Sequence, residues 1–164
     1  MYEKILVPLD GSKEGEAALP FVEELVVKLA PATRVEVTLL QVVSSLTHYV
    51  VAGEASVPVP YTEKELELIK RRSKTYLDKA GDGLKSKGAI VNTKVATGKA
   101  ADEIIRVSDE TKADVVAMST HGRSGLSRLA FGSVTDKVLK GGNVPVLMIR
   151  APKGITETSN DPEE

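Results

Sequence analysis

The stretch ADVVAMSTHGRSGLSRLAFGSVTDKV, residues 113–138, joins a short apolar run to a glycine-containing turn and then to a helical pattern. Residues 113–119 are apolar almost throughout, which is typical of a strand that is covered on both faces of a sheet. A helix is predicted over residues 132–140, and the glycine pair at 141–142 is expected to end it. A buried strand that leads into a helix is the unit from which parallel α/β sheets are built.

The same alternation of strand and helix runs through the rest of the chain. Strands are predicted over residues 4–9, 34–43, 89–98, 113–119 and 144–150. Helices are predicted over residues 12–30, 61–88, 99–112 and 132–140. This alternation predicts an α/β fold: one Rossmann-like domain over residues 1–150, with an open, twisted, parallel five-stranded sheet in the order 3-2-1-4-5 and helices on both faces.

Proline and glycine interrupt this pattern at four places. Pro20 stands inside the first helical pattern, so that helix is expected to kink or to begin later than its N-cap residue Ser12. Residues 44–60 show no period and end in VPVP, which predicts a long connecting loop that is mobile or functional. The glycine-rich residues 81–88 are interpreted as a turn at the end of a helix. Pro145 cannot donate to a strand ladder, which puts it at a sheet edge or at the start of the last strand.

The composition excludes several classes of function. The 22 Lys and Arg residues balance 23 Asp and Glu residues, so the net charge of −1 lacks the basic excess of a non-specific nucleic-acid binder. The absence of cysteine excludes disulfides, thiolate nucleophiles and cysteine-ligated zinc or iron–sulfur sites. No apolar stretch approaches the roughly 18 residues that span a bilayer, and no basic amphipathic segment points to a membrane surface. We therefore expect a cytoplasmic protein with a disordered acidic tail over residues 151–164.

Two polar, turn-rich segments are expected to face each other across the sheet. In a sheet of the order 3-2-1-4-5, ligands bind beyond the carboxyl ends of the strands where the strand order reverses. That point lies between the first and fourth strands, which end in PLDGS (residues 8–12) and MSTHGRSG (residues 118–125). The topology therefore predicts a ligand site between these two segments.

The second segment has the residues of an anion site. Gly122 lets backbone approach a ligand closely, and Gly132 and Ser133 stand at a helix start, where free N–H groups bind anions. Arg123 adds a positive charge suited to phosphate. Alternatively, Ser133 and Asp136 form a capping box, and the segment is only a turn with a helix start.

The spacing of this segment resembles the universal stress protein family, in particular its nucleotide-binding members. Those members carry a G-x2-G-x9-G-[ST] loop after the fourth strand, and the corresponding positions are Ser119, Gly122, Gly132 and Ser133. Further similar stretches are ILVPLDGSKEGEAAL (5–19), VTLLQV (37–42) and GSVTDKVLKGGNVPVLMIR (132–150). The resemblance covers residues 1–150 and departs from the family pattern at Ser119, where the pattern has glycine.

The resemblance implies an ATP site, with AMP or ADP as alternatives and with Mg²⁺ or Mn²⁺ held by the phosphates. The contacts that it implies fall on Pro8, Leu9, Asp10, Val42, Met118, Ser119, His121, Gly122, Arg123, Gly132, Ser133, Val134 and Thr135. It also implies a homodimer through the apolar last strand, from Val144 to Ile149, whose exposed edge is expected to be covered.

Some of these residues have a second interpretation. Asp10 either accepts hydrogen bonds from ribose or caps the turn before the first helix. Val42 and Met118 either border the base or only fill the core. If the position of Ser119 needs a positive φ, serine weakens the site; if it needs only a small side chain, serine fits and adds a hydroxyl.

The favoured function is a cytoplasmic, nucleotide-binding module of the stress response with at most slow ATP hydrolysis. No nucleophile with an assured base is evident, since HGRSGLS (121–127) lacks the GxSxG spacing of a hydrolase. One alternative is a family member that binds no nucleotide and acts through protein contacts. The other is a nucleotidyl- or phosphoryl-transfer enzyme, for which Arg123 and Arg128 are the nearby candidates. Two histidines, His48 and His121, do not suffice for a dedicated zinc site.

Overall fold

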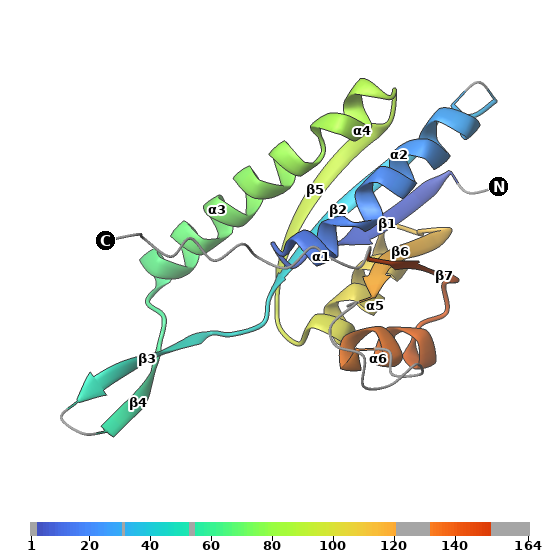
Figure 1. The fold of residues 1–164 in the computed structure, drawn as a ribbon. Helices are drawn as coiled ribbons and strands as arrows, with labels where there is room; N and C mark the ends of the chain where they lie inside the picture. Colours follow the sequence, from blue (N-terminus) through green and yellow to red (C-terminus); the bar gives the residue numbers. More distant parts are fainter. Residues whose placement is uncertain (1–2, 31, 53–54, 121–131, 152–164) are drawn as a thin grey trace, which may run out of the picture.

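Five parallel strands form the central sheet of the computed structural model, which describes residues 3–30, 32–52, 55–120 and 132–151 (Figure 1). The strands are β1 (Lys4–Pro8), β2 (Glu36–Val43), β5 (Ile90–Thr97), β6 (Val115–Thr120) and β7 (Val146–Arg150). Their spatial order is β5-β2-β1-β6-β7, and every neighbouring pair is parallel. Counted along the chain, these five strands have the predicted order 3-2-1-4-5, so the predicted fold is confirmed.

Helices pack on both faces of this sheet and form two apolar layers (Figure 1). The first layer joins Ile5, Val7 and Leu39 to the helices α2 (Ala18–Leu29), α3 (Glu63–Ala80) and α4 (Asp82–Ser86). The second joins Leu6 and Leu40 to the helices α5 (Ala100–Glu110) and α6 (Ser133–Gly141). Neighbouring residues of a strand point to opposite faces, which is why Leu6 and Val7 belong to different layers.

The chain enters the first helical region in two steps. Ser12 is the N-cap of the short helix α1 (Lys13–Glu16), and its hydroxyl accepts the N–H of Gly15 at 3.0 Å. A new helix, α2, begins at Ala18, so Pro20 lies in its first turn, where a missing N–H costs little. The predicted later start of the helix is confirmed, and the interruption itself lies at Ala17, three residues before Pro20.

Residues 44–60 contain a β-hairpin, so their prediction as an irregular loop is wrong. Strands β3 (Thr47–Ala52) and β4 (Ala55–Pro60) pair antiparallel as a separate two-stranded sheet. The hairpin projects away from the sheet between β2 and α3 (Figure 1). Apolar side chains on both of its faces remove the alternation of polar and apolar residues by which half-buried strands are found.

Residues 81–88 are more regular than a turn. Gly81 ends α3, with its N–H donating to the carbonyl of Leu77 at 2.9 Å, and Asp82–Ser86 then form the single helical turn α4. The turn prediction is therefore wrong for this helical part, because glycine at a helix end does not prevent a new helical turn from following. Gly88, with a φ of 92°, follows α4 before β5 begins.

The last strand lies at one edge of the sheet. Pro145 precedes β7, as predicted, and its carbonyl accepts the N–H of Val116 at 2.9 Å. Ala151 is only 2% exposed, so the chain is still packed one residue beyond β7. The remainder of the predicted acidic tail lies outside the described residues. Within the described ranges, no helix is both long and apolar enough to cross a membrane.

Candidate functional site

A cavity of about 260 Å³ opens at the carboxyl ends of β1 and β6, where the strand order reverses. Every predicted site residue within the described part of the chain lines it, namely Pro8, Leu9, Asp10, Val42, Met118, Ser119, Gly132, Ser133, Val134 and Thr135. The remaining predicted site residues, His121, Gly122 and Arg123, lie outside the described residues. The two segments expected to face each other are thus brought together around one space.

The cavity has further lining residues that the sequence reasoning missed, namely Gly15, Leu40, Ala100 and Ile104. Leu40 stands two residues before Val42 on β2, so strand periodicity places both on one face and could have found it. Ala100 and Ile104 are one helical turn apart at the start of α5. No local signal in the sequence marks Gly15.

Asp10 shapes the turn that leads from β1 into α1. Its Oδ1 accepts the N–H of Ser12 at 2.9 Å and the hydroxyl of Ser12 at 2.6 Å. A Cβ on Gly15 would lie 2.6 Å from the same oxygen, so a side chain there would displace the Asp10 carboxylate from this position. Asp10 therefore caps the turn, as one of its two interpretations predicts, while its exposed side chain also borders the cavity.

Ser119 links β6 to α1 across the cavity. Lys112 is the one non-glycine residue with a positive φ in the described ranges, so the backbone at Ser119 needs no glycine. The Ser119 hydroxyl donates a hydrogen bond to the carbonyl of Glu14. Of the two interpretations of the serine, the one in which a small side chain fits and adds a hydroxyl agrees with this geometry.

The start of α6 forms the polar end of the cavity. Gly132 is the N-cap and Ser133 the first helical residue, and no side chain makes a cap hydrogen bond. The carboxylate of Asp136 is held instead by Lys140, at 2.9 Å. The alternative in which Ser133 and Asp136 form a capping box is therefore wrong, since the helix begins one residue earlier than that box requires.

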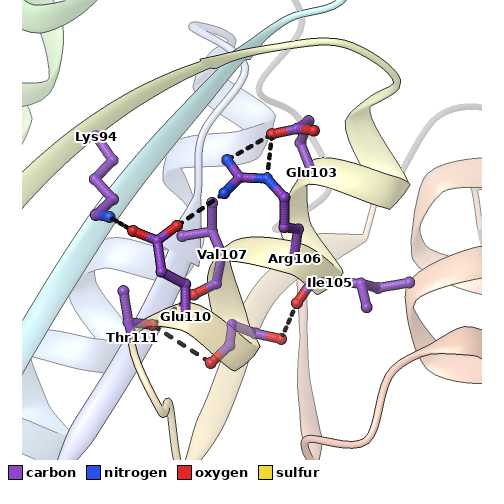
Figure 2. A network of polar contacts seen from close by, with 8 residues as sticks. Lys94, Glu103, Ile105, Arg106, Val107, Glu110 and Thr111 are labelled. Carbon is purple, nitrogen blue, oxygen red and sulfur yellow. Dashed lines mark hydrogen bonds and ion pairs between the residues drawn. The ribbon is translucent and has the colours of Figure 1, made fainter.

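A charged network fixes α5 against β5 (Figure 2). Lys94 of β5 donates to Glu110, and Arg106 bridges Glu110 at 2.8 Å and Glu103 at 2.9 and 2.8 Å. The ammonium of Lys94, with Arg106 behind it, holds the pKa of the Glu110 carboxyl below its ordinary value. The hydrogen bonds to Glu103 raise the pKa of Arg106.

The network also reaches the cavity wall. Gly98 has a φ of 143°, and a Cβ there would lie 3.2 Å from Cγ of Glu103. Glu103 therefore packs over the glycine that leads into α5. The first turn of α5, with Ala100 and Ile104, is in this way positioned along the cavity.

A resident metal has no obvious cluster of ligands in the described ranges. No group of three or more His, Cys, Asp or Glu side chains that could hold a metal ion occurs in that part of the chain. Among the described residues, the cavity lining includes one carboxylate, that of Asp10, and polar groups from Ser119, Ser133 and Thr135. These groups are suited to hydrogen bonding with a polar ligand.

The sequence is similar to known proteins over most of its length. Residues 1–150 match the universal stress protein family. Universal stress protein MJ0531 of Methanocaldococcus jannaschii is 31% identical over 154 residues, which cover 93% of this chain and 85% of the relative. Universal stress protein YxiE of Bacillus subtilis is 30% identical over 157 residues, which cover 92% of this chain and 100% of the relative.

Solved structures share the fold. The hypothetical protein MJ0577 superimposes with a TM-score of 0.68 at 25% identity, covering 93% of this chain and 99% of the other. A universal stress protein in complex with cAMP gives a TM-score of 0.63 at 18% identity, covering 92% and 98%. The universal stress protein from Archaeoglobus fulgidus in complex with dAMP gives 0.60 at 20% identity, covering 90% and 98%. The sequence match and the shared fold together show that this chain belongs to the universal stress protein family.

Proposed function

We propose that this protein binds an adenine nucleotide in the cavity between β1 and β6 and acts as a nucleotide-dependent module of the stress response. The observation that carries the proposal is the cavity itself: residues predicted from two distant segments, from Pro8 to Asp10 and from Gly132 to Thr135, line one space. The proposal includes a cytoplasmic location and a homodimer through the last strand, both expected from the sequence.

The lining is divided in a way that suits a nucleotide. Leu40, Val42, Ala100 and Ile104 are apolar and suit the faces of an adenine ring. Asp10, at the end of β1, suits hydrogen bonds from ribose hydroxyls.

The phosphates would extend toward the start of α6. The first-turn N–H groups of this helix, which no cap side chain engages, suit a negatively charged group. A cavity of about 260 Å³ is small for a complete ligand site, so it suits the nucleoside, with the phosphates toward its open side.

The relatives support this ligand class. Universal stress proteins of the same fold have been solved with cAMP and with dAMP, which share the adenine ring and a phosphate. ATP is the proposed ligand, with Mg²⁺ or Mn²⁺ held by its phosphates, and AMP and ADP are alternatives. The proposed role is binding with at most slow hydrolysis rather than efficient catalysis.

The test combines identification of a carried-over nucleotide with calorimetric titration. Purified protein is denatured and any released nucleotide identified; ATP, ADP, AMP and cAMP are then titrated with and without Mg²⁺. Gly132→Val places a branched side chain at the cavity, at a φ of −57° that any residue adopts. We expect it to weaken ATP binding about tenfold or more.

Asn143→Val is the matched control, because it adds the same side chain at an exposed position beyond the other end of α6. It should bind like the unaltered protein. No carry-over and no binding of any adenine nucleotide would overturn the proposal and favour the alternative of protein contacts alone. Fast turnover of ATP would favour the transfer enzyme.

A further inference from the structure

The hairpin of β3 and β4 exposes apolar side chains on both of its faces. Tyr49 is 72% exposed and Val51 78%, and Val50 and Val57 on the opposite face are also exposed. Neither strand packs extensively against a described element other than its hairpin partner, and Figure 1 shows the pair standing clear of the sheet and its helices. An isolated two-stranded hairpin is marginally stable in water, so an apolar hairpin of this kind calls for further strands.

The register of the hairpin determines which backbone groups point outward. The N–H of Tyr61 donates to the carbonyl of Leu46 at 3.0 Å, so these two residues form a hydrogen-bonded pair. Hydrogen-bonded and non-hydrogen-bonded pairs alternate in an antiparallel ladder. The next pairs are Thr47 with Pro60, then His48 with Val59, then Tyr49 with Pro58. The prolines therefore fall in non-hydrogen-bonded pairs, with their nitrogens at the outer edge.

The two outer edges of the hairpin consequently differ. On β4, Pro58 and Pro60 present no N–H, so that edge cannot accept another strand across those positions. On β3, the outward positions are Thr47, Tyr49 and Val51, and each has an N–H and a carbonyl. The carbonyl of Thr47 already accepts the hydroxyl of Ser45 at 2.9 Å and keeps its second lone pair for a further bond. Proline and charged residues are the usual protection of a free edge. The edge of β4 has this protection and the edge of β3 does not.

We propose that the β3 edge pairs with the β3 edge of a second copy of this chain, antiparallel about a two-fold axis at Tyr49. This register pairs Tyr49 with the partner copy's Tyr49 and pairs Thr47 with the partner copy's Val51, so every outward residue named above finds a partner. Two hairpins then form one four-stranded sheet, whose outer edges are both β4. Because the prolines block those edges, the sheet does not grow beyond four strands.

The β3 edge carries no charged side chain, so it suits a second copy of itself better than it suits a charged strand. Residues 47–52 and 55–60 contain no Lys, Arg, Asp or Glu, so two copies of the edge meet without like-charge repulsion. The net charge of −1 for the whole chain adds little repulsion. The Tyr49 and Val51 side chains share one face and would form a continuous apolar row with their partners. This interface is separate from the cavity and from β7.

The test introduces a proline at the edge without disturbing the hairpin. Tyr49→Pro removes an outward N–H and leaves the ladder to β4 intact, as Pro58 does opposite it. Ser56→Pro is the matched control: it also lies in a non-hydrogen-bonded pair, but its nitrogen faces the edge of β4 that is already blocked. Sedimentation velocity over a concentration series should show Tyr49→Pro in smaller assemblies than the unaltered protein, down to the dimer proposed through β7, and Ser56→Pro associating like the unaltered protein.

A cross-link reports the hairpin contact separately from any dimer through β7. The chain has no cysteine, so Tyr49→Cys introduces a single thiol, which a short bismaleimide should link to the same thiol of a second copy. Lys87→Cys, at an exposed position at the end of α4, beside the sheet edge opposite β7 and away from the hairpin, should not cross-link comparably. Three results would each overturn the proposal. They are an unaltered protein that stays monomeric at every concentration, a Tyr49→Pro variant that associates normally, and a Tyr49→Cys variant that fails to cross-link. The same variants are also titrated with ATP. Their ATP affinity tests the proposed nucleotide site independently of the association through the hairpin.

Discussion

Two strands of this molecule have similar apolar content and opposite surroundings. β6, with the sequence VVAMST, holds Val115 at 4%, Val116 at 1% and Ala117 at 0% exposure. β3, with the sequence THYVVA, leaves Val51 at 78%. β6 is reached through the crossover helix α5 and lies between β1 and β7, whereas β3 returns directly as a hairpin and no helix covers it. The connection to the next strand, rather than composition, decides whether an apolar strand is buried.

The difference also divides the proposed roles. The strands buried between helices hold the ends of β1 and β6 in fixed positions and so build the cavity. The exposed hairpin contributes nothing to that cavity and presents its backbone edge to solvent. The same substitution should therefore change the free energy of unfolding differently in β6 and in β3.

The largest effect is expected from removing the same two methyl groups in each strand. Val116→Ala should lower the free energy of unfolding by about 2 kcal/mol, because it leaves a void between β6 and α5. Val51→Ala should change it by less than about 0.5 kcal/mol in dilute protein. Urea unfolding at low protein concentration measures both. Equal losses would mean that the hairpin is packed against the body of the protein in solution.

A smaller effect is expected at Ser119. Ser119→Gly restores the glycine of the family pattern but loses the hydrogen bond to the carbonyl of Glu14. The free energy of unfolding should fall by about 1 to 2 kcal/mol, from the lost bond and the added backbone freedom. Nucleotide affinity should stay within about threefold.

Ser119→Ala separates the two contributions, since it loses the bond and adds less backbone freedom. It should therefore be destabilised less than the glycine variant. Much tighter nucleotide binding by Ser119→Gly would show that serine obstructs the site, contrary to the geometry described above.

The smallest effect is expected from the network on α5. Lys94 first, and then Arg106, hold the pKa of Glu110 below its ordinary value of 4.5. A carboxyl with a lowered pKa in the folded state stabilises the fold above that ordinary value, and the contribution is lost as the pH falls through the lower pKa. Glu110→Gln should lower Tm by about 1 to 2 °C at pH 7, and the difference from the unaltered protein should shrink below pH 4.

Asp109→Asn is the control for that comparison, because it neutralises the adjacent carboxylate on the same helix, outside the network. Thermal unfolding followed by circular dichroism between pH 7 and pH 3 measures both variants. If the Tm difference between Glu110→Gln and the unaltered protein stayed constant down to pH 3, it would not come from the lowered pKa of Glu110.

Much of the fold is predictable from the sequence, because apolar runs alternate with amphipathic helices and each parallel connection requires a crossover. Pro20 correctly indicated that the main helix of this region begins later than Ser12. The hairpin could not be found, because its side chains are apolar on both faces and its prolines lie at an edge that only the register reveals. Apolar periodicity detects strands with one face on the core and one face in solvent. The two faces of β3 and β4 do not differ in this way.

The cavity was also predictable in outline but not in detail. The segments at residues 8–10 and 132–135 follow from the topology. Ile104 belongs to both core and cavity, and Ala100 lines the cavity one helical turn before it, so only tertiary packing assigns these two residues. The capping box failed by one residue, since the first residue of α6 is Ser133 rather than Val134. A pattern of side chains does not fix a helix start that closely.

Pairing through the hairpin depends on how much of the protein is present, because the prolines of β4 leave only the β3 edge open. Pairing through one open edge follows mass action, so the paired fraction rises with the amount of protein made. Pro58 and Pro60 end the growth of the hairpin sheet at four strands, where an edge open on both sides would continue into a longer sheet. The size of the assembly would thereby report the amount of protein present.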